Sequence, residues 1–353
     1  MAALNLYKQT VRKALGDPVI CSGVKLARHL GVLDTISQKP MAARAIATQL
    51  NMKERFILEL SHAMTASGVV SMNAEGILSI PKEDTAFLLE EAGKAKWEPH
   101  LEATLPVLLK CFPVDGSKGY NLDEAPAVLE LINQSRAPAT DKLIKAFIAN
   151  INLYHPDKQN ITDVLDFGCG TGDITVPLAK SLDGVSVTGC DTSPLAIESA
   201  TKASGGVKNI NFVQVDTKTL DESWTKKFDV ILLFDVLHDL PYPEETMTQV
   251  KNVLKDDGIL IIIDPGVSSN PLNNLNNPRA AYALTVSTFY CVPSSCNHLH
   301  SHALGVSWGN ENKEMFLTKQ GLIIKNQIAL LDSLFFHTFV CVKDAKKGKM
   351  GKK

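Results

Sequence analysis

The spacing of apolar positions along the chain changes near residue 160. From there on, short runs rich in Val, Ile and Leu recur: ITDVLDF (161–167), VSVTGCD (185–191), INFVQVD (210–216), FDVILLFDVL (228–237) and GILIIID (258–264). Helical segments separate the first four runs, and another helical segment precedes the fifth. This alternation predicts βαβ units and a parallel sheet that is buried on both faces.

Two more apolar runs, LIIKNQIAL (322–330) and SLFFHTFVCV (333–342), follow each other almost without a break. Because so short a link joins only antiparallel strands, we expect these two to form an antiparallel pair. The predicted fold class is α/β, with a Rossmann-like sheet of seven strands within a domain of residues 161–345.

Residues 1–95 have a different pattern. KPMAARAIATQL (39–50) predicts a helix that starts near its proline, and KERFILELSHAMTASG (53–68) predicts a second helix. The apolar face of the second helix consists of Phe56, Ile57, Leu60 and Met64. VVSMNAEGILSI (69–80) then predicts a hairpin. Helices followed by a hairpin are typical of a winged-helix domain, and residues 96–160 are predicted to be a helical connector.

Composition narrows the class of protein. A chain of 353 residues with 45% hydrophobic and 21% charged residues is typical of a soluble protein of two domains. It has no apolar run of the roughly 18–20 residues that a membrane span needs, and its start lacks the pattern of a secretory signal. The seven cysteines are scattered without a CxxC pair, which is typical of reduced thiols and indicates a cytoplasmic location.

Charge argues against nucleic acid as a partner. The net charge is −2, but the stretch KDAKKGKMGKK at the end of the sequence carries six Lys and one Asp, so the rest is more acidic than that value. In the helix that would read DNA, Lys53 and Arg55 are offset by Glu54 and Glu59, so a basic face is missing. We interpret residues 1–95 as a packing or dimerisation domain, and residues 346–353 as a basic disordered tail.

The stretch VLDFGCGTGD (164–173) carries the first candidate chemistry. It places Gly168, Gly170 and Gly172 between the first predicted strand and a helix, where glycine lets the backbone turn tightly and approach a ligand closely. The spacing G-x-G-x-G differs from the dinucleotide fingerprint G-x-G-x-x-G. Asp173, at the start of that helix, would also repel a pyrophosphate. The expected ligand therefore has no anionic group at this point.

S-adenosylmethionine (SAM) meets this condition, because it carries a sulfonium and an ammonium group but no phosphate. Three acids end three consecutive predicted strands: Asp166, Asp191 and Asp216. Open α/β sheets bind ligands at this edge. Asp166 can face the methionine ammonium, Asp191 the ribose hydroxyls and Asp216 the adenine amino group. Taken singly, each acid would more often cap a helix or a turn.

The same motifs resemble class I SAM-dependent methyltransferases. VLDFGCGTGD is similar to their first motif and VTGCDTSPLAIESA (187–200) to their second. The whole chain resembles a family in which a winged-helix dimerisation domain precedes this fold, including plant phenolic O-methyltransferases and the enzymes that O-methylate N-acetylserotonin. NNLNNPRAAYALTVSTFYCVPSS (273–295) and ALGVSWGNE (303–311) are most similar to a subfamily found in bacteria and animals.

LLFDVLHDLPYPEE (232–245) resembles the catalytic His-Asp stretch of that family, although Leu240 stands where the plant enzymes usually have Trp. The resemblance implies a homodimeric enzyme that methylates a small molecule, most directly at oxygen. His238 would be its general base and Asp239 a second catalytic candidate. An imidazole of ordinary pKa suits this task near neutral pH. The remaining cofactor-binding candidates are Thr217, Phe234 and Asp235.

Residues 265–308 are predicted to form a long irregular segment, of the kind that often serves as a lid. The acceptor-binding candidates within it are Phe289, Tyr290, His302 and Trp308. In NHLHSH (297–302), the three histidines alternate and would share one face of an extended chain. We predict no metal site there, because no acid or cysteine completes it.

Two other interpretations stay open. Oxygen, nitrogen and carbon acceptors share this cofactor fold, so an N- or C-methyltransferase is the first alternative. The second is a winged-helix regulator that binds SAM without catalysis.

Overall fold

The computed structural model describes residues 2–95, 98–121, 124–137, 140–157, 159–330 and 336–344. The chain divides into two compact units. The first, called the N-terminal unit, combines residues 1–131 and 267–309. The second, called the sheet unit, combines residues 132–266 and 310–353. The predicted basic tail, 346–353, lies outside the described residues.

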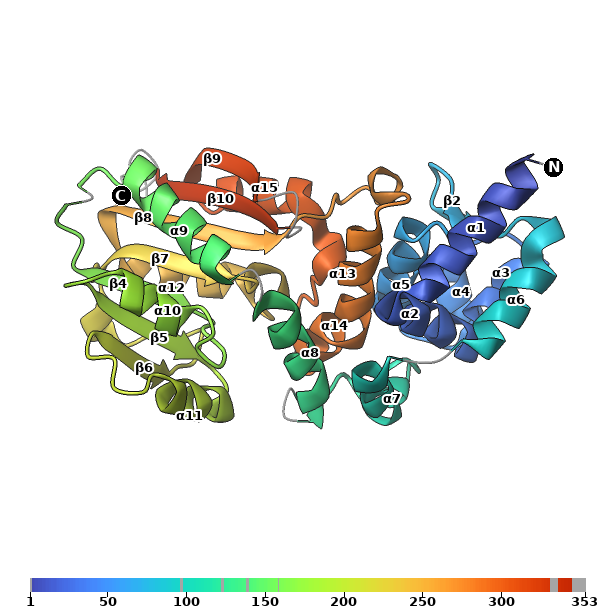
Figure 1. Ribbon diagram of the computed structural model, residues 1–353, viewed down its shortest axis with the longest axis horizontal. Coiled ribbons are helices and arrows are strands. Elements are labelled where there is room, and N and C mark those ends of the chain that lie inside the picture. The colour runs from blue at the N-terminus through green and yellow to red at the C-terminus, as the bar shows by residue number, and fades with distance from the viewer. Residues whose placement is uncertain are drawn as a thin grey trace. The chain divides into compact units, whose positions relative to one another are not determined.

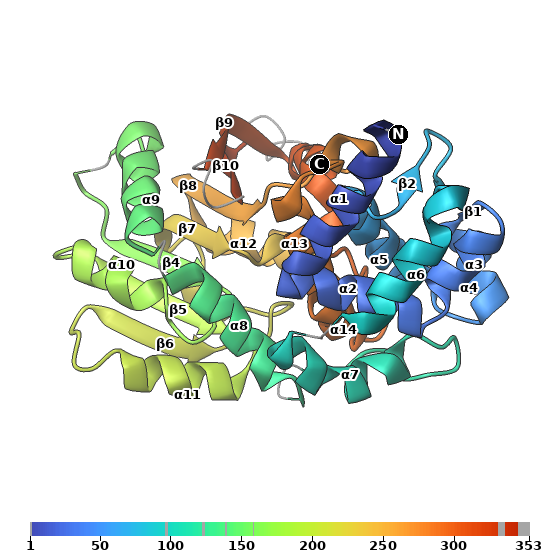
Figure 2. The ribbon, with the colours of Figure 1, turned by 45° about the vertical axis from the view of Figure 1, so that its right-hand side comes forward.

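The sheet unit is built on one seven-stranded sheet of order β6-β5-β4-β7-β8-β10-β9, which can be followed in Figures 1 and 2. The strands are β4 (Asp163–Phe167), β5 (Ser186–Asp191), β6 (Ile210–Gln214), β7 (Phe228–Phe234), β8 (Leu254–Pro265), β9 (Leu322–Leu330) and β10 (Phe336–Lys343). Strands β4 to β8 are parallel to one another, and β10 is antiparallel to both β8 and β9. The predicted fold class and the antiparallel pair at the end are confirmed.

Helices accompany these strands in the predicted βαβ alternation, except between β6 and β7, where a 3-10 helix, Glu222–Trp224, takes the place of the predicted helix. They are α9 (Thr140–Tyr154), α10 (Thr175–Ser181), α11 (Pro194–Ala203), α12 (Pro243–Val253) and α15 (Gly309–Lys319). Helix α9 buries Phe147 and Ile151 in the same apolar cluster as Val164 of β4 and Ile261 of β8. This packing places α9, predicted as part of the connector, in the sheet unit.

The N-terminal unit begins with α1 (Ala2–Gly16) and α2 (Pro18–His29). It continues with α3 (Val32–Gln38), β1 (Met41–Ala42), α4 (Ala43–Leu50), α5 (Glu54–Ala66), β2 (Ser71–Met72), β3 (Ile77–Ser79), α6 (Thr85–Lys94) and α7 (Pro99–Cys111). The three short strands form an antiparallel sheet of order β1-β3-β2. From α3 to β3, the elements follow the order expected of a winged helix. The four apolar residues predicted on one face of α5 are all buried.

The start of α4 and the contacts of α5 in this unit bear on the predictions for residues 1–95. Helix α4 starts at Ala43 rather than near Pro40, because the two residues before it pair with β3 instead. On α5, the Arg55 guanidinium donates to the Ala303 carbonyl at 2.7 Å and pairs with Glu59 Oε2 at 2.8 Å. This basic side chain is therefore committed within the unit, and the absence of a nucleic-acid partner stays a prediction.

The prediction that residues 265–308 are irregular is wrong. They contain α13 (Pro278–Phe289), α14 (Cys291–Cys296) and two short 3-10 helices, Pro271–Asn274 and Val306–Trp308. Helix α13 is buried over most of its surface, including three Ser and Thr positions, so it lacks the apolar and polar alternation that marks a surface helix. Its sequence therefore gave no periodic signal.

Helix α13 also explains where the units divide. It packs against α5 and α2, and a Cβ added at Gly23 of α2 would lie 2.9 Å from Thr285 Cγ2, so the two helices approach closely. Residues 267–309 therefore belong with the N-terminal unit, although they were predicted within a domain of residues 161–345. The predicted connector also divides, because α8 (Pro126–Arg136) spans the boundary.

In the described part of the chain, no helix is both long enough and apolar enough to span a bilayer.

Candidate functional site

The glycine loop follows β4 at the carboxyl edge of the sheet. Gly168, Gly170 and Gly172 have φ of 79°, 53° and 84°, a region that residues with a Cβ rarely adopt. The N–H groups of Gly168 and Cys169 both donate to the Cys190 carbonyl, at 2.8 and 3.0 Å. The loop is thereby fixed to the end of β5.

The three glycines differ in what surrounds them. A Cβ at Gly168 would lie 2.5 Å from Val236 Cγ2, and one at Gly172 would lie 3.1 Å from Ala200 Cβ. A Cβ at Gly170 would meet nothing within 4 Å. The packing of the protein itself requires the first and third glycines, whereas Gly170 borders open space. That space is what a ligand cradle needs, so the loop fits the predicted cofactor.

The first two strand-end acids meet at this loop. Asp191 accepts from the N–H of Gly170 at 2.9 Å through Oδ2 and from the N–H of Ser193 at 3.0 Å through Oδ1. Asp166 is buried, and its Oδ2 accepts from the Thr175 hydroxyl at 2.6 Å. Burial raises the pKa of Asp166 to about 6, and the nearby Asp191 acts in the same direction. Both acids therefore support the loop and the helix behind it, a local role of the kind that a single strand-end acid most often has.

The other cofactor-binding candidates lie at neighbouring strand ends. Asp216 is exposed after β6, where its Oδ1 accepts from the N–H of Lys218 at 2.9 Å. Thr217 follows it in the same turn. Phe234 ends β7, and Asp235 turns the chain away from the sheet with φ of 58°, an uncommon value for a residue other than glycine.

His238 lies in a short 3-10 turn, Leu237–Asp239, directly after β7 and is 1% exposed. Its Nδ1 is 3.0 Å from Asp264 Oδ1, and its Nε2 is 3.1 Å from Asp239 Oδ1. Asp235 Oδ1 is 3.9 Å from Nδ1. The carboxylate of Asp239, the second catalytic candidate, thus faces the imidazole.

These contacts indicate the protonation state of His238. A neutral imidazole has one N–H donor, while an ionised carboxylate can only accept hydrogen bonds. The hydrogen bond to the ionised Asp264 therefore places a proton on Nδ1 of His238. The 3.1 Å approach of Asp239 Oδ1 to Nε2 lacks hydrogen-bond geometry and does not require a second proton on the ring.

Sequence reasoning missed Asp264 and its partner Lys313. Asp264 lies near the end of β8, next to β7 in the sheet, and is fully buried. Lys313 of α15 is fully buried too; its Nζ is 2.7 Å from Asp264 Oδ2 and donates to the Pro265 carbonyl at 3.0 Å. Burial alone would raise the pKa of Asp264, but the charges of Lys313 and His238 outweigh it and lower that pKa well below its usual range.

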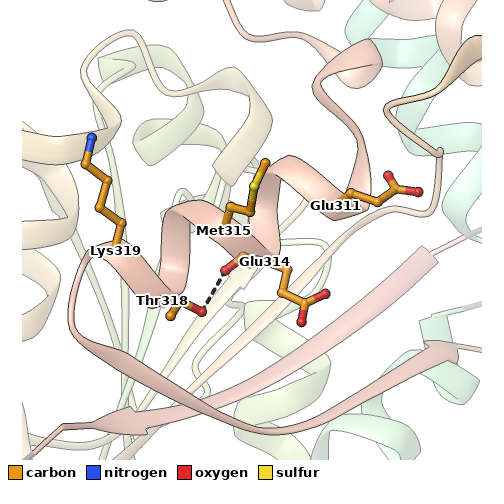
Figure 3. A pocket seen from close by; sticks show the side chains of 5 residues that line it. All are labelled: Glu311, Glu314, Met315, Thr318 and Lys319. Carbon is orange, nitrogen blue, oxygen red and sulfur yellow. Dashed lines mark hydrogen bonds between the residues drawn. The ribbon is translucent and has the colours of Figure 1, made fainter.

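The pattern of α15 held a signal for this pair. Its exposed face lines a surface hollow, shown in Figure 3, with Glu311, Glu314, Met315, Thr318 and Lys319. Lys313 instead shares the buried face with Phe316 and Leu317. A lysine on the apolar side of an amphipathic helix needs a buried partner, and the acid at the end of a neighbouring strand supplies one.

The acceptor-binding candidates belong to the N-terminal unit, whereas the cofactor-binding and catalytic candidates belong to the sheet unit. Phe289 and Tyr290 are buried at the end of α13, where the Phe289 carbonyl accepts from the Tyr120 hydroxyl. His302 is exposed and Trp308 is half-buried.

The histidines of NHLHSH do not lie on an extended chain. The N–H of Ser301 donates to the His298 carbonyl at 3.3 Å, and His300 has φ of 58°, so the segment is a turn. The premise that alternate histidines share a face is therefore wrong. Among the described residues, the donor groups close enough to hold a metal include none of these three histidines. One such group joins Asp235, His238 and Asp264, but Lys313 already balances Asp264.

Comparison with known proteins supports the interpretation of this edge of the sheet as a cofactor-binding site. Residues 158–320 match the family model described as a methyltransferase domain. This part of the chain is a SAM-dependent methyltransferase domain. The predicted class I resemblance, the enzyme class of the domain and SAM as its cofactor are thereby confirmed.

The methyltransferase domain accounts for the similarity to curated relatives. The malonyl-[acyl-carrier protein] O-methyltransferase of Halalkalibacterium halodurans is 33% identical over 100 residues, which cover 28% of this chain and 37% of that protein. The physcion biosynthesis cluster O-methyltransferase of Aspergillus chevalieri is 32% identical over 157 residues, covering 40% of this chain and 64% of that protein. The chain thus spans less than two thirds of the length of either relative.

Solved structures extend the likeness in fold to both units. An O-methyltransferase family 2 protein from Planctomyces limnophilus, in complex with apigenin, gives a TM-score of 0.61 at 16% identity and covers 96% of this chain and 95% of that chain. The CurJ carbon methyltransferase gives 0.52 at 14% identity and covers 94% and 96%. At these identities the likeness concerns the fold alone.

The open space at Gly170 leads to a prediction about the methyltransferase domain. Gly170→Val should abolish the rise in melting temperature that SAM causes, because the new side chain would fill that space. Gly184→Val is the control, since Gly184 also has positive φ and an open surrounding but lies far from the loop in sequence. Thermal unfolding with and without SAM measures both. An unchanged shift in Gly170→Val, or a shift caused equally by NAD, would contradict this assignment.

The raised pKa of Asp166 gives a pH-dependent prediction. Because folding disfavours its ionised form, this group makes the free energy of unfolding fall as pH rises from about 4 to about 6. Asp166→Asn should therefore gain stability relative to wild type over that range, by up to about 3 kcal/mol. Urea unfolding at several pH values tests this, with the exposed Asp183→Asn as control. Parallel pH curves for wild type and Asp166→Asn would show that burial leaves this carboxyl unperturbed.

Proposed function

We propose that the protein is an enzyme that transfers a methyl group from SAM to a small-molecule acceptor, at an oxygen atom, with His238 as general base. The observation that carries this proposal is the buried imidazole after β7, held at Nδ1 by the Asp264 carboxylate. A base fixed by a second carboxyl group is the arrangement that proton abstraction requires. The names of the O-methyltransferase relatives support the choice of oxygen.

The residues of this chain would divide the work as follows. When bound, SAM supplies a methyl group on a sulfonium, which is already an activated leaving group. The glycine loop would hold it against the end of β4, with Asp191 keeping Gly170 in place. Asp216, Thr217, Phe234 and Asp235 would complete the cofactor-binding edge, and Phe289, Tyr290, His302 and Trp308 would contact the acceptor.

His238 would act through Nε2, because Nδ1 is committed to Asp264. In the structure, Asp239 lies at Nε2, so an acceptor hydroxyl must displace its carboxylate before it can give up a proton. His238 would act as a base in its neutral form, with its proton on Nδ1 toward Asp264. Nε2 would then take the proton of the acceptor hydroxyl as the methyl group is transferred.

The alternatives make different demands on His238. The fold is shared with a carbon methyltransferase, so the fold does not select the acceptor atom. An amine that is neutral at pH 7 would need no base, and a regulator that only binds SAM would need no buried His-Asp pair. The cost of burying this pair favours an acceptor that must lose a proton.

The general base assignment is tested by His238→Ala. SAM binding should stay nearly unchanged, while turnover should fall by about 10²–10⁴, the usual contribution of a positioned base. Part of the loss should return at high pH, where the acceptor hydroxyl ionises without help. Turnover is measured from pH 6 to 10 on acceptors found by screening metabolite extracts with labelled SAM. His29→Ala, which removes an exposed imidazole, is the control. Unchanged turnover in His238→Ala at every pH would exclude it as the base.

The cytoplasmic location of the protein stays a prediction.

We further propose that the protein is a homodimer that pairs through residues 1–95. Helix α1 exposes Leu6, whose side chain is 66% accessible to solvent. Light scattering should give twice the chain mass of 38.4 kDa. Leu6→Glu should weaken the dimer, whereas Leu195→Glu on α11 should leave it intact. A 38.4 kDa particle for the wild type across micromolar concentrations would refute the dimer.

A further inference from the structure

We propose that Lys313 is a positioning residue that sets the proton affinity of His238, acting through Asp264. The proposal rests on the proposed function of His238 as base. It concerns a residue whose ammonium group pairs with Asp264 and donates to the Pro265 carbonyl, and which therefore acts on the imidazole only through Asp264.

The burial of Lys313 argues against a purely structural role. The side chain is fully buried beside Phe316 and Leu317, on a helix whose other face exposes its charged residues. A buried ion pair is often no more stabilising than apolar side chains of the same volume. Stability alone therefore gives little reason for a charge at this position, and the chain that runs from Lys313 through Asp264 to His238 supplies another reason.

The charges around His238 define that reason. Three carboxylates face the imidazole, those of Asp235, Asp239 and Asp264, and each of them favours its protonated form. With no balancing cation, these negative charges would make the ring hold its proton more tightly and weaken it as a base. Lys313 supplies a positive charge 2.7 Å from the remote oxygen of Asp264, which lowers the affinity of the ring for its proton.

A further titratable group also faces Lys313, from the strand next to β8. His337 of β10 is directly opposite Asp264 in the strand register. Burial, and then the charge of Lys313, lower the pKa of His337, while Glu314 and Glu311 act weakly in the other direction. His337 is therefore neutral at neutral pH and does not share the negative charge of Asp264 with Lys313.

The test compares variants that differ in charge at one position. Lys313→Gln removes the charge but keeps donors for Asp264 and the Pro265 carbonyl, and Lys313→Arg keeps the charge. Lys319→Gln removes a charge from the exposed face of the same helix. The measurement is a pH titration of the ¹⁵N-labelled ring nitrogens of His238 by NMR in the full chain, assigned with His238→Asn. It needs no acceptor.

Loss of the buried positive charge should raise the midpoint at which the His238–Asp264 pair releases its proton. We expect the midpoint to rise by about one to two pH units in Lys313→Gln, because a unit charge that neighbours the pair in a protein interior is removed. Lys313→Arg should restore most of the wild-type midpoint, and Lys319→Gln should not move it. A midpoint in Lys313→Gln equal to that of wild type, or an equal rise in Lys319→Gln, would overturn the proposal.

Lys313→Gln leaves Asp264 without its cation, so the wild-type protein provides a second test that does not depend on folding of the variant. The ¹⁵Nζ resonance of the buried Lys313 should shift with the same pH midpoint as the ring of His238. A Lys313 resonance that does not respond to that titration would overturn the proposal.

Turnover distinguishes this proposal from the proposed function. Where an acceptor is known, turnover should rise with pH as His238 loses its proton. In Lys313→Gln this rise should move to higher pH by the same amount as the NMR midpoint, and turnover should recover at high pH. A uniform loss of kcat at all pH values would instead indicate a structural role and overturn the proposal. Failure of His238 as the base would appear as full turnover of His238→Ala, with the NMR result unaffected.

Discussion

A buried carboxylate must have its charge balanced inside the protein, and the site of this protein is arranged around that requirement at Asp264. The residue is fully buried, so its ionised form depends on the imidazole on one oxygen and the ammonium on the other. His238 follows β7, Asp264 ends β8, and Lys313 comes from α15. Displacement of any of these three elements would leave a charge unpaired, which is far more costly than loss of an ordinary contact.

The strand order explains why the site forms where it does. The order in which the strands are added to the sheet reverses between the parallel strands β4 and β7. After β4 the chain adds β5 and β6 on one side, and it then returns to add β7 and β8 on the other. Open α/β sheets bind ligands at such a point. The glycine loop follows β4 and His238 follows β7, so the cofactor-binding half and the proton-transfer half of the candidate site start from adjacent strands. Each half is also fixed to the next strand outward, through the Cys190 carbonyl of β5 and Asp264 of β8.

Much of this could be predicted from the sequence, because the relevant signals are local. Strand runs, the glycine spacing and the acids at strand ends can be read within a few residues of each other. Helix α13 could not be predicted, since a helix buried on most sides shows no alternation of apolar and polar positions. The pair formed by Asp264 and Lys313 could not be predicted for a different reason. Neither residue belongs to a sequence motif, and each acquires its role only from a partner that is distant in the chain. The NHLHSH interpretation failed because it assumed an extended backbone that the turn at His300 does not provide.

The path of the chain around Asp264 and Lys313 has a consequence for how the two units are joined. The chain leaves the sheet unit after Gly266 and returns to it at Asn310, so residues 267–309 are in effect an insertion between β8 and α15. The ion pair between Asp264 and Lys313, with the bond from Lys313 to the Pro265 carbonyl, holds the two ends of that insertion next to each other from within the sheet unit. The sheet unit thus meets the entropic cost of closing this long connection. The methyltransferase sheet therefore places few demands on the inserted segment and on the acceptor-binding candidates that it carries. The constraint on that segment comes instead from the packing of α13 against α5 and α2.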